Sequence, residues 1–209
     1  MEQENKVVKI LLKIGAIKFS FENPITFKSG IVSPIYMDNR KLPFHPEEWK
    51  EVLEEMKNLI QENNLVFDII AGVEAGGIPH SAGLGLLISK PSVFVRKKAK
   101  EHGTKSMIEG GEVKGKKVLL VEDLVSTGIS SLASVKAIRE EGGEVNNCLA
   151  IASYGFEEGE EAFKNEDINL ISLVSFADII KEAEKGKYLD EEKLSELKKW
   201  FSDPRAWKN

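Results

Sequence analysis

Apolar residues follow two different periodicities in the N-terminal part of this chain. From Val7 to Ile14 they recur at helical spacing, and Gly15 stands where such a helix would end. Short stretches rich in β-branched and aromatic residues come next, separated by turn residues such as Asn23-Pro24. These short strands are expected over residues 17–22, 25–30 and 33–39. The pattern before residue 46 therefore predicts a small helix followed by a β-rich hood.

From Pro46 onward the pattern changes to long helices and buried strands. Residues 46–64 form an amphipathic pattern, and Pro46 suits the first turn of that helix. Further helices are expected over 78–89, 129–141 and 158–165, and again toward the C-terminus. Nearly continuous apolar runs separate them, at 66–72, 92–95, 117–122, 144–153 and 168–174. Such alternation is typical of a parallel sheet covered by helices on both faces.

We therefore predict an α/β fold with a five-stranded, mostly parallel, doubly wound sheet. Residues 1–209 are expected to form a single domain, in which 1–45 are the N-terminal helix and hood and 46–209 are the core and C-terminal helices. The chain has 209 residues, a length that can bury one good core.

Charge and cysteine content narrow the classes of function. The net charge of −5 argues against a nucleic-acid or membrane surface that depends on overall charge. The single cysteine, Cys148, excludes an internal disulfide and a cysteine-rich zinc site. No apolar run approaches the roughly 18 residues of a membrane span, and the N-terminus does not resemble an export signal. We expect a cytoplasmic protein.

The stretch VLLVEDLVSTGISS, residues 118–131, carries the clearest chemistry. An apolar strand leads to Glu122 and Asp123, and small residues connect these acids to the helix at 129–141. Ligands of parallel sheets bind beyond the carboxyl ends of the strands. The turn at 126–130 offers free backbone amides, a positive helix end and hydroxyl groups, and Gly128 permits close approach. This turn is suited to a phosphate.

The surrounding sequence restricts which phosphate compound fits. Neither GxxxxGK[ST], typical of nucleoside triphosphate sites, nor GxGxxG, typical of dinucleotide sites, is present. Two carboxylates would repel a phosphate unless neutral groups separated them, and ribose hydroxyls supply such groups. The stretch therefore suits a ribose 5-phosphate. The alternative is an acidic strand end that caps an ordinary helix.

The same stretch resembles the ligand-binding signature of the type I phosphoribosyltransferase family. Four other segments extend the likeness over nearly the whole chain: FKSGIVSPIYMDNR (27–40), AGVEAGGIPH (71–80), FVRKKAKEHG (94–103) and KKWFSDPRAW (198–207). The hood segments are most similar to the branch of the family that acts on orotate. The resemblance implies binding of 5-phosphoribosyl 1-diphosphate (PRPP) by Glu122, Asp123, Leu124, Val125, Ser126, Thr127, Gly128, Ile129 and Ser130.

The basic segment after residue 95 is a second candidate contact. A run of charge is usually a solvated surface, but cations on a loop of an acidic protein also suit a polyanion. In the family this loop closes over the diphosphate, in part across a dimer interface. The resemblance implies that PRPP contacts Arg96, Lys97, Lys100 and His102, and that Lys97 and Lys100 act in catalysis with Asp123. The expected assembly is a homodimer.

Two further segments complete the expected site. Gly76 and Gly77 can present backbone amides to the diphosphate, although some relatives have a lysine where Gly76 stands. Lys28 matches a position that reaches PRPP in some relatives. For orotate, the resemblance points to Tyr36 and to the Ser126 hydroxyl.

The sequence leaves two features of the orotate site undecided. Residues 35–37 could instead simply be a strand that fills the hood. Many relatives also carry an orotate-binding arginine where this chain reads SYGFEEG (153–159), without an arginine.

The implied reaction transfers phosphoribosyl from PRPP to N1 of orotate and releases diphosphate, with Mg²⁺ held through substrate oxygens and no certain direct protein ligand. Two alternatives are a phosphoribosyltransferase for another nucleobase and a non-catalytic PRPP-binding regulator. His45 and His80 lack sequence partners for a metal site or a catalytic triad, and we expect surface or cap roles for both.

Overall fold

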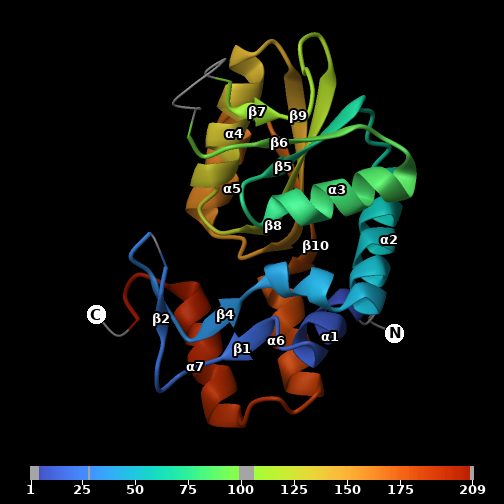
Figure 1. Cartoon of the computed structure of the whole chain (residues 1–209). Helices are drawn as coiled ribbons and strands as arrows, with labels where there is room; N and C mark the ends of the chain where they lie inside the picture. The colour runs from blue at the N-terminus through green and yellow to red at the C-terminus, as the bar shows by residue number, and fades with distance from the viewer. Residues whose placement is uncertain (1–4, 28, 99–105, 208–209) are drawn as a thin grey trace.

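A six-stranded sheet forms the centre of the molecule in a computed structural model, which describes residues 5–27, 29–98 and 106–207 (Figure 1). Its strand order is β10-β9-β8-β5-β6-β7. The strands are β5 (Ile69–Val73), β6 (Ser92–Val95), β7 (Ile108–Glu109), β8 (Lys117–Val125), β9 (Glu144–Ser153) and β10 (Asn169–Ser175). All neighbours are parallel except β7, which runs antiparallel to β6.

The five predicted strands are confirmed, and β7 is an addition at the edge of the sheet. With two residues, β7 is too short to produce a periodic pattern in the sequence. One boundary also differs from the prediction. Strand β8 continues to Val125, so Glu122 and Asp123 lie inside the strand rather than just beyond it. Strand β9 remains paired with it up to Val125 and Ser153.

Helices cover both faces of the sheet, as the apolar strands require. Helices α2 (Pro46–Glu62) and α3 (Gly77–Ile88) lie on one face, and α4 (Ile129–Glu140) and α5 (Glu157–Asn165) lie on the other (Figure 1). Side chains of β8 alternate between the two faces of the sheet: Leu119 and Val121 belong to one apolar cluster, and Val118 and Leu120 belong to the second. Each such buried side chain contributes roughly 1.5–3 kcal/mol.

The hood contains segments from both ends of the chain. Its N-terminal elements are α1 (Lys6–Lys13), β1 (Ile17–Phe19), β2 (Ile25–Thr26), β3 (Val32–Ser33), β4 (Ile35–Met37) and the 3₁₀ helix η1 (Asn39–Phe44). Helices α6 (Phe176–Lys185) and α7 (Glu191–Ser202) pack with them (Figure 1). The Trp200 indole N–H donates to the Val32 carbonyl at 2.8 Å, and the Asn5 amide donates to the Leu173 carbonyl at 2.8 Å. The first bond joins two segments within the hood, and the second fixes the hood against the edge strand β10 of the sheet.

In the part of the chain that the structure describes, no helix has the length and apolar character that crossing a membrane requires.

Candidate active site

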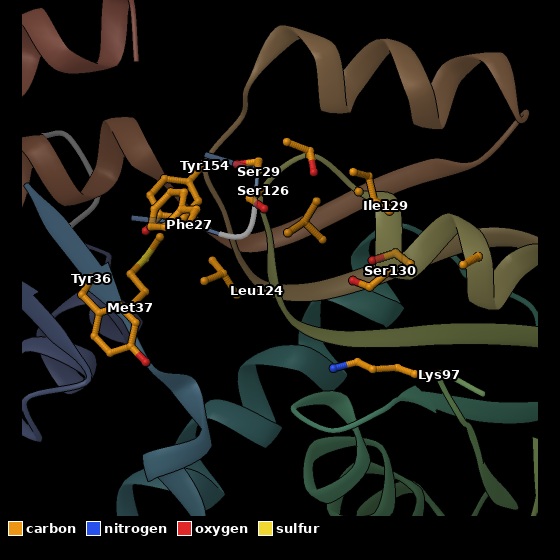
Figure 2. Close-up of a pocket in the computed structure, with 15 residues that line it drawn as sticks. Phe27, Ser29, Tyr36, Met37, Lys97, Leu124, Ser126, Ile129, Ser130 and Tyr154 are labelled. Atoms are coloured by element: carbon orange, nitrogen blue, oxygen red, sulfur yellow. The ribbon is translucent and has the colours of Figure 1, made fainter. Parts of the chain in front are cut away.

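A cavity of about 480 Å³ lies where the carboxyl end of β8 meets the hood (Figure 2). Its walls come from the β8–α4 connection, from the hood, and from residues that follow β6 and β9. The lining residues are Phe27, Ser29, Tyr36, Met37, Lys97, Leu124, Val125, Ser126, Thr127, Gly128, Ile129, Ser130, Ser131, Ala133 and Tyr154. The cavity therefore gathers the predicted turn at 126–130, Tyr36 and Lys97 around one space.

The turn before α4 is shaped to receive an anion. Gly128 occupies the position before the helix with φ +75°, in the left-handed region that glycine adopts without strain. The helix start carries no side-chain capping bond and lines the cavity, so its first amides and the positive end of the helix dipole are available to an anion there. A Cβ at Gly128 would come within 2.7 Å of the Phe163 ring. Both the backbone angle and the available space therefore require glycine here.

Glu122 and Asp123 form a buried acidic pair beside this turn. Glu122 is 4% exposed; its carboxylate accepts bonds from the Ser131 hydroxyl at 3.1 Å and from the Asp123 amide at 3.2 Å. Burial, and next the neighbouring charge of Asp123, raise the pKa of Glu122 well above its usual range. Burial also raises the pKa of Asp123, against the opposing effect of Glu122 hydrogen bonding and the Arg40 charge. The pair can therefore accept hydrogen bonds, and it holds a proton more readily than exposed carboxylates do.

The loop after β5 lies directly against this pair. A Cβ at Gly76 would overlap the Asp123 carboxylate, so a side chain would fit there only if Asp123 moved. The backbone of Gly76 and the start of α3 at Gly77 are therefore what this loop can offer to a ligand. Its Glu74 carboxylate accepts a bond from the Lys97 amide at 2.6 Å, which joins this loop to the basic segment.

The basic residues are only partly within the described structure. Lys97 lines the cavity on the side away from Tyr154 and Phe27 (Figure 2). Arg96 is not among the lining residues, and its guanidinium lies 3.6 Å from the Glu109 carboxylate on β7. Lys28, Lys100 and His102 lie outside the described residues, so their roles stay predictions.

The hood side of the cavity is aromatic. Tyr36 lines it, and the Arg40 guanidinium donates to the Tyr36 hydroxyl at 3.1 Å. Tyr154 is 1% exposed, its ring centroid lies 5.2 Å from that of Phe27, and it stacks on Phe156 at 5.2 Å. Burial raises the pKa of Tyr154, so its hydroxyl stays neutral.

Sequence reasoning missed Phe27, Met37 and Tyr154 as parts of this wall. Tyr154 stands in the segment 153–159, where the family resemblance leads us to expect an arginine, so a neutral ring occupies this part of the cavity wall. The aromatic residues at 154 and 156 were the available signal, but which ring reaches the cavity depends on how the hood packs.

The two histidines differ from each other. His45 precedes α2 at its capping position, although its side chain makes no capping bond. The expectation of a surface or cap role is wrong for His80, which is fully buried and accepts a bond from the Trp49 indole at 3.0 Å through Nδ1. Burial lowers the pKa of His80 to about 4, so it is neutral at physiological pH. Within the described ranges, no group of three or more acidic, histidine or cysteine side chains could hold a metal ion.

Comparisons with known proteins agree with this geometry. The model of the phosphoribosyl transferase domain family matches residues 44–187. The chain is 41% identical over 207 residues to the orotate phosphoribosyltransferase of Coxiella burnetii, covering 99% of each. A crystal structure of the Aeropyrum pernix orotate phosphoribosyltransferase superposes with a TM-score of 0.75 at 29% identity, covering 88% of this chain and 99% of that one.

The fold is also shared with a ligand-bound structure. The Mycobacterium tuberculosis H37Rv orotate phosphoribosyltransferase in complex with PRPP matches with a TM-score of 0.66 at 24% identity, covering 84% of this chain and 97% of that one.

Proposed function

This chain belongs to the orotate phosphoribosyltransferases, within the phosphoribosyl transferase family, and we propose that the cavity beside β8 is the site of their reaction. The enzyme transfers the 5-phosphoribosyl group of PRPP to N1 of orotate, which yields orotidine 5′-monophosphate and diphosphate in pyrimidine biosynthesis. The observation that carries the assignment to this cavity is the helix start without a side-chain cap that lines it; the buried acidic pair, which is not itself among the lining residues, precedes this turn in the same strand.

In this proposal the β8–α4 turn binds the 5-phosphate of PRPP. The amides and hydroxyls from Ser126 to Ser130 surround the phosphate, and the helix dipole favours its charge. Leu124 and Val125 form the adjoining wall. Glu122 and Asp123 accept hydrogen bonds from the two ribose hydroxyls, which separate these acids from the phosphate.

The diphosphate leaves toward the loop after β5 and the basic segment. Backbone amides at Gly76 and Gly77 and the ammonium of Lys97 are suited to it. Arg96, Lys28, Lys100 and His102 complete this set in the proposal, on the strength of the family resemblance. Arg96 would have to exchange its Glu109 partner for the diphosphate.

The orotate ring lies in the aromatic part of the cavity, between Tyr36 and the rings of Phe27 and Tyr154. The Ser126 hydroxyl can donate to its carboxylate. Departure of diphosphate leaves positive charge on the anomeric carbon, and the nearby acids stabilise that charge while the walls exclude water. Holding N1 in line with this carbon supplies much of the remaining acceleration.

We propose Mg²⁺ as the cofactor. The available donors fit this role, because Mg²⁺ needs few protein oxygens when a substrate supplies phosphate oxygens. Bound in this way, it would neutralise the charge of the leaving diphosphate, and Glu122 and Asp123 would face it through the ribose.

We also propose a cytoplasmic homodimer in which the basic loop reaches the neighbouring subunit's site. The support for the dimer is the resemblance of the basic segment to the family's loop. The support for the location is the single, buried thiol of Cys148, which suits a reducing compartment.

The direct test is a spectrophotometric assay of orotate consumption with PRPP and Mg²⁺, with each reactant omitted in turn. Adenine, xanthine and uracil replace orotate in parallel reactions. We expect loss of orotate only when PRPP and Mg²⁺ are both present. Turnover of another base alone would favour a different base specificity, and PRPP binding without diphosphate release would favour a regulator.

A further inference from the structure

Asn39, at the start of η1, makes a direct bond from the hood to the acidic pair. Its side-chain amide donates to the main-chain carbonyl of Asp123 at 2.6 Å, across 84 residues of sequence. The Asn39 side chain is completely buried. Since the acceptor is a carbonyl, only the amide nitrogen can face it, and this fixes the orientation of the side chain.

The sheet explains why this carbonyl needs a partner. Strand β5 ends at Val73 and pairs with β8 only as far as Val121, whereas β9 pairs with β8 through Val125. The Asp123 carbonyl therefore lies beyond the last β5 pair. In the interior such a carbonyl must find another donor, and the Asn39 amide takes the place of the missing strand.

Stability alone does not account for an asparagine at this position. Its own oxygen, Oδ1, is buried without a hydrogen-bond partner among the described residues, which is unfavourable for folding. The gain from one hydrogen bond is therefore offset by an unsatisfied acceptor on the same side chain. What the bond does fix is the position of Asp123 relative to the hood.

Asn39 is also close in sequence to the base side of the cavity. Tyr36 and Met37 on β4 line that side, and η1 begins two residues after Met37. One hydrogen bond thus connects the wall proposed for orotate with the acid proposed for ribose. A shift of either part would change the distance between N1 and the anomeric carbon, on which the rate depends steeply.

We propose that Asn39 is a positioning residue that holds Asp123 in its ribose-binding orientation and sets it against the base-binding wall. This inference rests on the proposed function of the cavity. Asn39 does not touch the substrates itself and acts through the Asp123 main chain.

The first test compares Asn39→Ala with Asn5→Ala. Asn5 is a control of the same residue type: its amide also donates to a strand carbonyl, Leu173, at 2.8 Å, away from the cavity, and its oxygen caps α1. We expect Asn39→Ala to lower kcat/KM for PRPP by about 10- to 100-fold, and Asn5→Ala to lower only the unfolding temperature. Equal kcat/KM values for Asn39→Ala and the wild type would overturn the inference.

The second test uses Asn39→Asp, which is nearly isosteric and serves even if Asn39→Ala does not fold. Ionised, the introduced carboxyl repels the Asp123 carbonyl; protonated, it can donate the missing hydrogen bond. We expect the activity of this variant relative to the wild type to rise as pH falls from about 8 to about 5.5. A relative activity that stays constant with pH would contradict a positioning role.

The two proposals fail differently in these assays. A wild-type protein that does not consume orotate would refute the proposed function. A wild-type protein that does consume it, beside an Asn39→Ala variant of equal kcat/KM, would refute only the role of Asn39.

Discussion

Glu122 and Asp123 are carboxylates held where water is largely excluded. Their ionisation therefore depends on whether substrate is bound. Their raised pKa values show that burial disfavours the ionised forms in the free protein. Hydrogen bonds from ribose hydroxyls and positive charge on the ribose both favour ionisation. These roles depend on two side chains, so single substitutions can test them.

Removal of the Asp123 charge should lower turnover strongly. We expect Asp123→Asn to decrease kcat by about 10²–10³-fold, comparable to the loss of one preorganised charge-stabilising group. Steady-state kinetics with saturating PRPP and orotate measures this. Asp167→Asn is a suitable control, since Asp167 is exposed and its φ of +56° is one that asparagine tolerates. Unchanged turnover of Asp123→Asn would remove this acid from the mechanism.

The raised pKa of Glu122 also predicts a pH-dependent cost to stability. The folded protein binds the Glu122 proton more tightly than the unfolded chain, so this residue destabilises the fold progressively as pH rises above the ordinary glutamate pKa. We expect Glu122→Gln to raise the unfolding temperature relative to wild type, and more at pH 8 than at pH 5.

Thermal unfolding at several pH values measures this difference, and the comparison with wild type cancels the opposite contribution of His80. The folded-state pKa of His80 is lowered to about 4, so its contribution to stability falls as pH drops from 6.5 toward 4. A Glu122→Gln difference that stays constant across the range would contradict the raised pKa.

Sequence reasoning identified these acids because strand and turn patterns are local. Glu122, Asp123 and Gly128 stand within seven residues, so their relation follows from one strand and one turn. Asn39, His80 and Tyr154 could not be assigned in this way, because their contacts come from segments far away in the chain. The surface role expected for His80 failed because the burial of the first turn of α3 depends on packing against Trp49 of α2.

The β8–α4 unit determines where the phosphate can bind. The strand delivers the acids, Gly128 turns the chain, and α4 begins without a cap so that its amides remain available. The extension of β8 to Val125 was not expected from the apolar run, because the two acids interrupt it. Pairing with β9 stabilises these polar positions in an extended conformation, an effect that lies outside the local pattern.

Substitution of the glycine in this turn should disturb both folding and binding. Gly128→Ala places a methyl group at φ +75° and within 2.7 Å of Phe163, so we expect roughly 2–4 kcal/mol of destabilisation and weaker PRPP binding. Denaturant unfolding and calorimetric titration with PRPP measure the two effects.

Gly115→Ala separates backbone strain from crowding, because Gly115 has φ +68° with nothing within 4 Å of an added Cβ. This control should lose only about 1–2 kcal/mol and bind PRPP normally. Equal effects of the two substitutions would argue against crowding by Phe163 and against phosphate binding by the turn at Gly128.

At the scale of the whole molecule, the site exists because the hood lies over the carboxyl edge of the sheet. The sequence predicted the α/β core and a hood from the N-terminal segments. The participation of α6 and α7 in that hood came from the structure, since amphipathic helices at the end of a chain do not indicate their partner. The cavity thus combines residues from Phe27 to Tyr154.

The proposed dimer gives a prediction at this scale. Asp123→Asn inactivates a subunit's own site, whereas Lys100→Ala should inactivate the site of its neighbour if the basic loop acts across the interface. When the two inactive variants are mixed and their subunits exchange, about half of the dimers are hybrids, and each hybrid has one intact site. The mixture should therefore recover about a quarter of wild-type activity. No recovery, with hybrid dimers shown by mass spectrometry, would mean that the loop serves its own subunit.

The central claim is that the turn from Ser126 to Ser130 binds the 5-phosphate while Glu122 and Asp123 bind the ribose. A crystal structure of the enzyme with PRPP and Mg²⁺ tests it most directly. We expect the phosphate oxygens within hydrogen-bonding distance of the amides at the start of α4, and the two ribose hydroxyls on the acidic pair. PRPP bound elsewhere, or with its diphosphate in this turn, would contradict the account.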